Sequence, residues 1–291
     1  MIQSETIRLP GGAALVSCVQ NWRMAPDTRI RRGAVIVCPG GGYAMLSPTE
    51  GEAVVPAFAA EGYQSFLLRY RTGGDAVWPN PLIDLGQAVA YVRAHAHELM
   101  LDPDKIAICG FSAGAHLCAM LGTVWNRPET AAAAGCTAEQ MRPNAMILCY
   151  PPTHLRIAGD GATLRLLAGG DEIGDLGERT DANRLVGTHT PPTFVWSMFD
   201  DADVPVELSL EFCRALTAAE VPFELHTFSH GLHACSLATA VTAFAGSENP
   251  HAAHWFPLCR EWLLSLFGPP VWEGGHSMDH LFIGPRAHVA E

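Results

Sequence analysis

The chain has 291 residues, of which 48% are hydrophobic and 16% charged, and its formal net charge is −12. This length and apolar content allow one large buried core and exclude a disordered polymer. Nucleic acid and anionic membranes would repel so acidic a chain, so neither is expected as a partner.

Nothing in the sequence predicts export or a membrane span. No stretch approaches the ~18 apolar residues that a spanning helix needs, and the N-terminus lacks the basic start and apolar block of a secretory signal. The nine cysteines are an odd number, and several, such as Cys38, Cys109 and Cys149, lie in apolar runs. We therefore expect buried, reduced thiols in a cytoplasmic protein, with no metal because the cysteine spacings match no metal site.

Along the chain, strand-like and helix-like segments alternate. Residues 1–32 predict antiparallel edge strands. Further strands are predicted at 33–40, 63–70, 105–110, 144–151, 192–199 and 222–228, and helices at 51–61, 82–99, 113–124, 207–219 and 252–267. Short apolar strands separated by helices favour parallel pairing with both faces of the sheet covered. The sequence therefore predicts a three-layer α/β sandwich formed by a single domain, residues 1–267.

Two stretches depart from this alternation. Residues 151–190 form a long irregular insertion, and an excursion of that length is more typical of a lid or binding segment than of a plain connection. Residues 268–291 form a C-terminal tail that packs either on the body or across a neighbouring subunit of a homo-oligomer. The sequence leaves both arrangements open.

A serine lies at one junction between a predicted strand and a predicted helix. The segment Gly110-Phe111-Ser112-Ala113-Gly114 matches the pattern G-x-S-x-G. In this context the pattern is typical of a nucleophile elbow, in which a strained turn exposes the serine hydroxyl at the carboxyl end of the sheet. The alternative is an ordinary serine that caps the helix.

A serine nucleophile needs a base, and the base needs an acid to orient it. In such a fold the acid and the histidine follow the serine in the chain, at the ends of later strands. Candidate acids after the strand at 192–199 are Asp200, Asp201 and Asp203, and candidate histidines after the strand at 222–228 are His230 and His233. His226 lies inside that strand and is interpreted as structural.

A glycine-rich segment, "CPGGGYAML", follows the first buried strand. Glycines there let backbone N–H groups approach a substrate oxygen, so Gly41 and Gly42, with the N–H of Ala113, are candidates for an oxyanion hole. A phosphate-binding loop is the alternative, but neither the lysine-serine/threonine ending nor the G-x-G-x-x-G spacing is present.

With these segments in place, the chain resembles the α/β-hydrolase superfamily, and within it the small bacterial esterase/lipase group related to acetyl-xylan and feruloyl esterases. The likeness covers roughly residues 31–267. Its motifs are "CPGGGY", "EGEAVVPAFAAEGYQSFLLRYR", "DPDKIAICGFSAGAHL", "RPNAMILCYPP", "TPPTFVWSMFDDADVPVELSL" and "VPFELHTFSHGLHACSLA".

The resemblance implies a role for each matched position. Ser112 matches the family nucleophile, His233 its histidine and Asp201 its acid, with Asp200 as the alternative one residue away. Three positions depart from common family residues: Pro39 where many relatives have histidine, and Ala115 and Ala234 where glycine is frequent.

The implied function is hydrolysis of small carboxylic esters without a cofactor. The implied substrates are esters of short acyl groups such as acetyl, with sugars among the alcohols that carry them. A serine peptidase of the acylaminoacyl or oligopeptidase type is the alternative enzyme, and a non-enzymatic scaffold is disfavoured because all triad positions are present. Tyr43, Trp78 and Trp125 are candidates for shaping the pocket but are more typical of core. Arg69 and Arg71 are expected in structural salt bridges.

Overall fold

A central sheet organises the protein. The structure is a computed structural model that describes residues 2–21, 29–158, 161–244 and 246–273. Within these residues the strands are β1 (Ile2–Gln3), β2 (Thr6–Arg8), β3 (Ala14–Gln20), β4 (Arg29–Cys38), β5 (Gln64–Arg69), β6 (Leu101–Phe111), β7 (Ala145–Cys149), β8 (Thr193–Met198), β9 (Phe223–Phe228) and β10 (Val271–Glu273). Their order is β1-β3-β5-β4-β6-β7-β8-β9, with β2 beside β3 and β10 beside β4.

The sheet is mostly parallel, as predicted. Strands β4 to β9 pair with one another in parallel. The N-terminal strands β1, β2 and β3 pair in antiparallel fashion at the edge next to β5. A parallel sheet aligns the carboxyl ends of its strands, so the loops that follow β4, β6, β7, β8 and β9 all meet at one end of the molecule.

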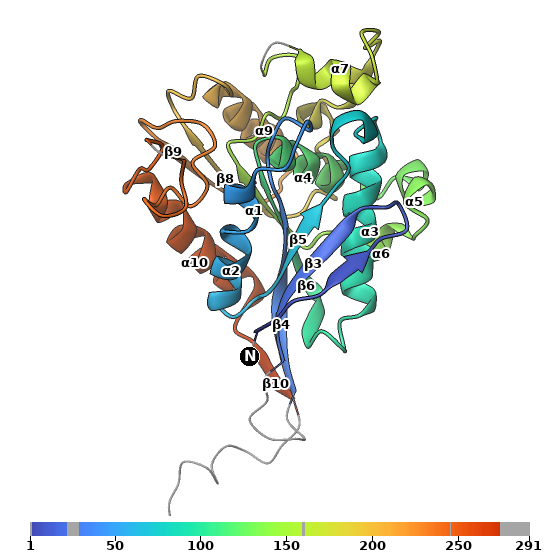
Figure 1. Ribbon diagram of the computed structural model, residues 1–291, viewed down its shortest axis with the longest axis vertical. Coiled ribbons are helices and arrows are strands. Elements are labelled where there is room, and N and C mark those ends of the chain that lie inside the picture. The colour runs from blue at the N-terminus through green and yellow to red at the C-terminus, as the bar shows by residue number, and fades with distance from the viewer. Residues whose placement is uncertain (1, 22–28, 159–160, 245, 274–291) are drawn as a thin grey trace, which may run out of the picture.

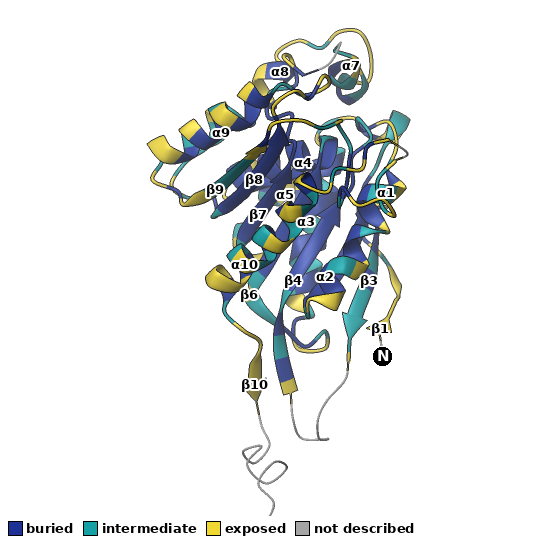
Figure 2. Ribbon diagram, turned by 90° about the vertical axis from the view of Figure 1, so that its left-hand side faces the viewer, coloured by how far each residue is buried: buried dark blue, intermediate teal, exposed yellow. Residues whose placement is uncertain are grey.

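Helices cover both faces of the sheet (Figure 1). The α-helices are α1 (Pro48–Gly51), α2 (Val54–Ala60), α3 (Asn80–Ala94), α4 (Ala113–Val124), α5 (Pro128–Ala134), α6 (Ala138–Met141), α7 (Ala162–Ala168), α8 (Leu176–Arg179), α9 (Val206–Ala218) and α10 (Trp255–Phe267), and the 3-10 turns are η1 (Gly73–Asp75), η2 (Ala182–Leu185) and η3 (Ala252–His254). Alternate side chains of β4 point to opposite layers: Ile36 and Cys38 pack with α3, α4 and α9, whereas Val35 and Val37 pack with α2 and α10. The central strands are buried on both faces (Figure 2), which confirms the three-layer sandwich.

Several element boundaries differ from the prediction. The helix expected over 51–61 is two short helices, α1 and α2, and the helix expected over 82–99 ends at Ala94. The strand expected to begin at Lys105 begins at Leu101, where it pairs with Arg32 of β4. Pairing with a neighbouring strand, which local sequence does not encode, extends this strand beyond its apolar run.

The insertion and the C-terminal segment lie at opposite ends of the molecule (Figure 1). The insertion contains α7, α8 and η2, so it is less irregular than its composition suggested. At the other end, β10 pairs with Arg29–Arg31 of β4, so the start of the tail packs on the body of the same chain. The rest of the predicted tail, from residue 274 onward, lies outside the described residues. No helix of the described chain has the length and apolar character to cross a membrane.

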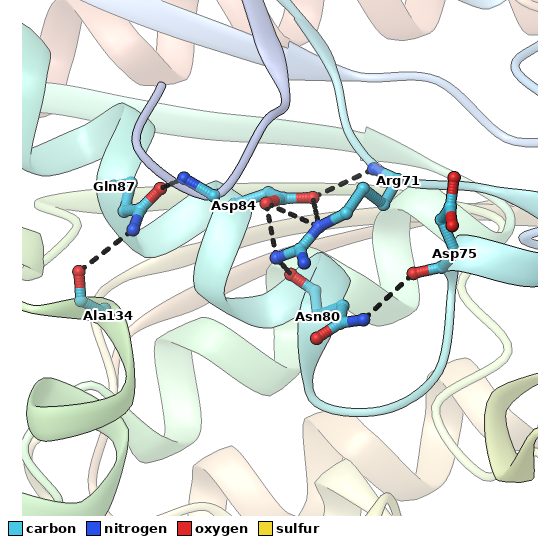
Figure 3. A network of polar contacts seen from close by, with 7 residues as sticks. Arg71, Asp75, Asn80, Asp84, Gln87 and Ala134 are labelled. Carbon is cyan, nitrogen blue, oxygen red and sulfur yellow. Dashed lines mark hydrogen bonds and ion pairs between the residues drawn. The ribbon is translucent and has the colours of Figure 1, made fainter. Parts of the chain in front are cut away.

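Two predicted structural features are confirmed. All nine cysteines lie in the described residues and are free thiols, and seven of them are buried. Arg69 forms a salt bridge with Glu52. Arg71 forms a bidentate salt bridge with the fully buried Asp84, and its guanidinium also donates to the Asn80 carbonyl (Figure 3). Burial raises the pKa of the Asp84 carboxyl, and the Arg71 hydrogen bonds and charge oppose that rise.

Candidate active site

Ser112 occupies a strained turn between β6 and α4. Its φ of +51° lies in the left-handed region, which residues other than glycine seldom adopt. The flanking glycines are required by contact: a Cβ atom on Gly110 would lie 2.2 Å from the Gly114 carbonyl oxygen, and one on Gly114 would lie 2.0 Å from that of Cys38. The backbone N–H of Ser112 donates to the Cys149 carbonyl at 3.0 Å, which ties the turn to the end of β7. This is the geometry of a nucleophile elbow.

A chain of hydrogen bonds joins Ser112 to a histidine and a carboxylate from later loops. His233 Nε2 lies 2.8 Å from Ser112 Oγ, and His233 Nδ1 lies 2.6 Å from Asp201 Oδ2. The other Asp201 oxygen accepts from the backbone N–H groups of Asp203 and Val204 at 2.9 and 3.0 Å. Because the Asp201 side chain is fully buried and accepts at both oxygens, it holds the Nδ1–H tautomer of His233, which leaves Nε2 free to accept the serine proton.

The other candidates take different places. The Asp200 carboxylate pairs with His230 at 3.0 Å and accepts from the Gly231 N–H at 2.9 Å, away from Ser112. These hydrogen bonds, the His230 bond first, lower the pKa of the exposed Asp200 carboxyl. His226 lies inside β9 and pairs with Glu224, in agreement with a structural part.

The surroundings of His233 favour its protonated form. Burial acts to lower the pKa of this imidazole, but the Asp201 hydrogen bond and the charges of Asp201, Glu50 and Asp203 together raise it above its ordinary value. An imidazole of raised pKa is a stronger base toward a hydroxyl than an isolated one.

Of the predicted oxyanion positions, two border the space beside Ser112. Gly42 and Ala113 line the pocket there, whereas Gly41 shapes the loop from behind: its φ is +119°, and a Cβ atom on it would lie 2.3 Å from the Met45 carbonyl oxygen. The N–H of Ala113 has no acceptor within its own helix because it is the first residue of α4. In the described residues, neither Gly41 nor Gly42 donates its backbone N–H to another backbone group.

The pocket beside Ser112 is small, with a volume of about 130 Å³. Besides the residues already named it is lined by Pro152, Leu155, Ala158, Thr163 and Val204. Four of these five belong to the insertion 151–190, which therefore forms one wall of the pocket. Tyr43, Trp78 and Trp125 do not line it: Tyr43 is fully buried, the Trp125 indole donates to the His189 carbonyl, and Trp78 borders a separate cavity of about 550 Å³.

Asp201, Asp203 and His233 bring potential metal-ligand atoms within 4.8 Å of one another. Hydrogen bonds already account for the arrangement, because Asp201 accepts from His233 and from the Asp203 backbone while His233 Nε2 faces Ser112. These residues therefore fit a proton-transfer site, and nothing in their geometry requires a cation.

Two buried polar side chains beside the site were not predicted from the sequence as functional residues. His116, one turn after Ser112 on α4, accepts from the Tyr43 hydroxyl at 2.8 Å and donates to the Thr180 carbonyl at 2.9 Å. Glu50, on α1, accepts from the backbone of the glycine-rich loop. Both lie in motifs that carry the family resemblance, Glu50 at the start of "EGEAVV" and His116 in "GFSAGAHL", but only the folded arrangement shows what they contact.

Comparison with known proteins places this geometry in a family. The BD-FAE family model matches residues 24–216, about two thirds of the chain, and the match includes Ser112 and Asp201. The chain belongs to the BD-FAE family. The resemblance inferred from its motifs is therefore confirmed at the level of the family.

Solved structures related to this BD-FAE chain agree on the fold. An acetyl ester-xyloside bifunctional hydrolase from Caldicellulosiruptor lactoaceticus is 32% identical, with a TM-score of 0.74 and 89% of each chain covered. The carboxylesterase Cest-2923 from Lactobacillus plantarum WCFS1 is 27% identical, with a TM-score of 0.80 over 91% of this chain and 97% of that one. The expected α/β-hydrolase fold is confirmed.

A curated relative, endo-1,4-beta-xylanase B of Butyrivibrio fibrisolvens, is 33% identical over 217 residues, 72% of this chain. The match covers 33% of that protein. Across the three curated relatives that match about 70% of this chain, the chain spans between a third and about half of the relative's length. Activities named for such longer proteins need not lie in the shared part.

Proposed function

We propose that this protein is a serine esterase that hydrolyses carboxylic esters through Ser112, His233 and Asp201. The observation that carries the proposal is the continuous hydrogen-bonded path from the buried Asp201 carboxylate through His233 to the Ser112 hydroxyl, which opens on a pocket. Family membership and the esterases among the related structures support it.

The mechanism follows from this path. His233 Nε2 removes the Ser112 proton as Oγ attacks the ester carbonyl, and Asp201 stabilises the imidazolium that forms. The N–H groups of Gly42 and Ala113 hold the oxyanion of the tetrahedral intermediate, and Gly41 shapes the loop that carries Gly42. The imidazolium then gives its proton to the departing alcohol, leaving an acyl-enzyme. Water, deprotonated by His233, hydrolyses that acyl-enzyme and restores Ser112. The proton taken from water returns to Ser112 Oγ from the His233 imidazolium, so His233 carries each proton that is transferred.

The substrate class is short-chain acyl esters, acetyl esters above all, with a sugar as one carrier. A pocket of about 130 Å³ is well below the roughly 300–1,000 Å³ typical of larger ligands, so it suits a small acyl group. The related acetyl ester-xyloside hydrolase supports a sugar ester.

The test is ester hydrolysis and active-site labelling by the full chain and by Ser112→Ala. Wild type should hydrolyse p-nitrophenyl acetate and acetylated xylosides and react with a fluorophosphonate probe, and Ser112→Ala should lose both by a factor on the order of 10⁴ or more. The matched control is Ser265→Ala, at an exposed serine of α10, which should behave as wild type. A Ser112→Ala protein that keeps its turnover would refute the proposal. Activity on aminoacyl-anilides without activity on esters would favour the peptidase alternative instead.

A further inference from the structure

A second buried carboxylate, Glu50, lies beside the reaction site. Glu50 is only 1% exposed, although a buried carboxylate is costly unless it is well partnered. Its Oε2 accepts from the backbone N–H of Gly40 at 3.0 Å, at the start of the oxyanion loop. The fit is close: a Cβ atom on Gly40 would lie 2.5 Å from Glu50 Oε2 and 2.9 Å from the Cβ of Ser112. The carboxylate therefore packs behind both the oxyanion loop and the nucleophile.

The other oxygen of Glu50 is joined to the loop that bears the histidine. The Tyr150 hydroxyl donates to Glu50 Oε1 at 2.6 Å, and its oxygen accepts from the Ser236 N–H at 3.2 Å. The Tyr150 ring is fully buried and packs edge-on to the His233 imidazole, with ring centroids 4.8 Å apart. Ser236 adds a second tie, because its hydroxyl donates to the Thr49 carbonyl at 2.5 Å.

These hydrogen bonds favour the ionised form of Glu50. The Tyr150 oxygen already accepts from Ser236, so its proton points to Glu50, and Gly40 can only donate. Burial is the largest influence and raises the pKa of the Glu50 carboxyl above its ordinary value, although the Tyr150 hydrogen bond, the His233 charge and the Gly40 N–H act in the opposite direction.

We propose that Glu50 is a positioning residue for ester hydrolysis: one oxygen fixes the oxyanion loop, the other fixes the His233 loop through Tyr150, and its negative charge stabilises the imidazolium. This inference rests on the proposed function. Glu50 touches no reacting atom. It acts through Gly40, Tyr150 and His233, so that the base and the oxyanion donors stay in register when charge separates in the transition state.

The test must separate this effect from the other charges nearby. The groups that face His233 or Glu50 are Asp201 and Asp203 after β8, Tyr150 after β7, Tyr70 after β5, and Cys235 on the histidine loop itself. None of them is altered by a substitution at position 50, so a change in the titration of His233 reports on Glu50.

The experiment is an NMR titration of the His233 ring in the full chain, with its signal assigned by loss in His233→Gln, together with kcat on p-nitrophenyl acetate. In Glu50→Gln the pKa of His233 should shift to lower pH, and kcat should fall between about ten- and a hundredfold. Glu50→Asp keeps the charge, so the His233 titration should stay near that of wild type. Glu52→Gln, an exposed residue two positions along, removes the same charge and should leave both readouts unchanged.

Two results would overturn the proposal: an unmoved His233 titration in Glu50→Gln, whether or not kcat falls, or an equal shift in Glu52→Gln. If Glu50→Gln does not fold, Tyr150→Phe tests the link from its other end, and a Tyr150→Phe protein with wild-type kcat would contradict the link. Because the titration needs no substrate, a shift in a protein that hydrolyses no ester would reject the proposed function and leave the link between Glu50 and His233 standing.

Discussion

Asp200 and Asp201 are neighbours in the sequence with different surroundings. The Asp201 side chain is buried and its oxygens bind His233 and two backbone N–H groups, whereas that of Asp200 is 47% exposed and pairs with His230. One residue of displacement at a strand end would exchange these places, which is why the sequence alone left both open. The hydrogen-bonded path to Ser112 runs through Asp201.

We predict that Asp201→Asn lowers kcat on p-nitrophenyl acetate by a factor on the order of 10³–10⁴, because an amide at this position favours the wrong tautomer of His233. Asp200→Asn, the same substitution one residue earlier, should lower it by less than about tenfold, since it loosens only the contacts to His230 and Gly231. Steady-state kinetics of the two variants decide between them. A larger loss of kcat in Asp200→Asn than in Asp201→Asn would make Asp200 the acid that orients His233.

Ala234 shows why a departure from a family pattern can be read only partly from sequence. It follows His233 and has a φ of +59°, a left-handed conformation that glycine adopts without strain. Backbone geometry therefore accounts for the glycine that the family resemblance leads one to expect at this position. The conformation itself is imposed by the loop, which must bring His233 back to Ser112, and no local signal in the sequence predicts it.

At the scale of elements, the insertion 151–190 matters because it walls the small pocket. Leu155 lines the pocket and is 2% exposed, so its side chain limits the space for the acyl group of the proposed substrate. We predict that Leu155→Ala raises the ratio of butyrate to acetate turnover by about tenfold or more, since each methylene accommodated in a pocket is worth roughly 1–3 kcal/mol.

The control for Leu155→Ala is Leu164→Ala, the same deletion in α7, at a residue that is equally buried but does not line the pocket. Both variants should lose stability by about 2–5 kcal/mol. Only Leu155→Ala should change chain-length preference in assays with p-nitrophenyl acetate and butyrate. If the two variants have the same preference between acetate and butyrate, Leu155 of the insertion does not determine acyl-chain selection.

The alternation of elements was predictable because apolar runs and their spacing encode strands buried on both faces. The strand and helix on either side of Ser112 follow directly from "KIAICG" and the apolar helix after it. The short helices α7 and α8 were not predicted, because glycines and charged residues interrupt their few apolar positions and tertiary contacts of Leu164, Leu167 and Leu176 stabilise them. The predicted start of β6 was wrong because pairing of Leu101 with the neighbouring strand β4 sets that boundary.

At the scale of the whole molecule, parallel topology gathers groups from distant parts of the chain. The loops after β4, β6, β8 and β9 supply the glycines, Ser112, Asp201 and His233, and their order in the sequence made the convergence predictable. The contacts behind these groups were not predictable. His116 links the Tyr43 hydroxyl, α4 and Thr180 of the insertion, and Glu50 links two loops. Both residues lie in motifs of the family resemblance, but a motif does not show which distant groups its side chains contact.

The burial of His116 couples the stability of the whole fold to pH. His116 is fully buried and neutral, and its pKa is lowered from 6.5 to about 4, by burial first, with the nearby His154 acting in the same direction and the Thr180 carbonyl opposing. As pH falls from 6.5 toward 4, the unfolded chain binds a proton at this residue and the native protein does not. The free energy of unfolding therefore decreases across this window, by about 3 kcal/mol in total.

We predict that His116→Gln, which keeps a donor and an acceptor but does not titrate, lowers the slope of unfolding free energy against pH. The decrease should correspond to at most one bound proton. The measurement is urea unfolding of both proteins at several pH values between 7 and 4. His233, whose pKa is raised, contributes with the opposite sign, since its stabilisation is present below its unfolded pKa and lost above its folded one. That contribution is common to both proteins and cancels in the difference. Parallel stability curves for wild type and His116→Gln would show that His116 does not couple folding to pH.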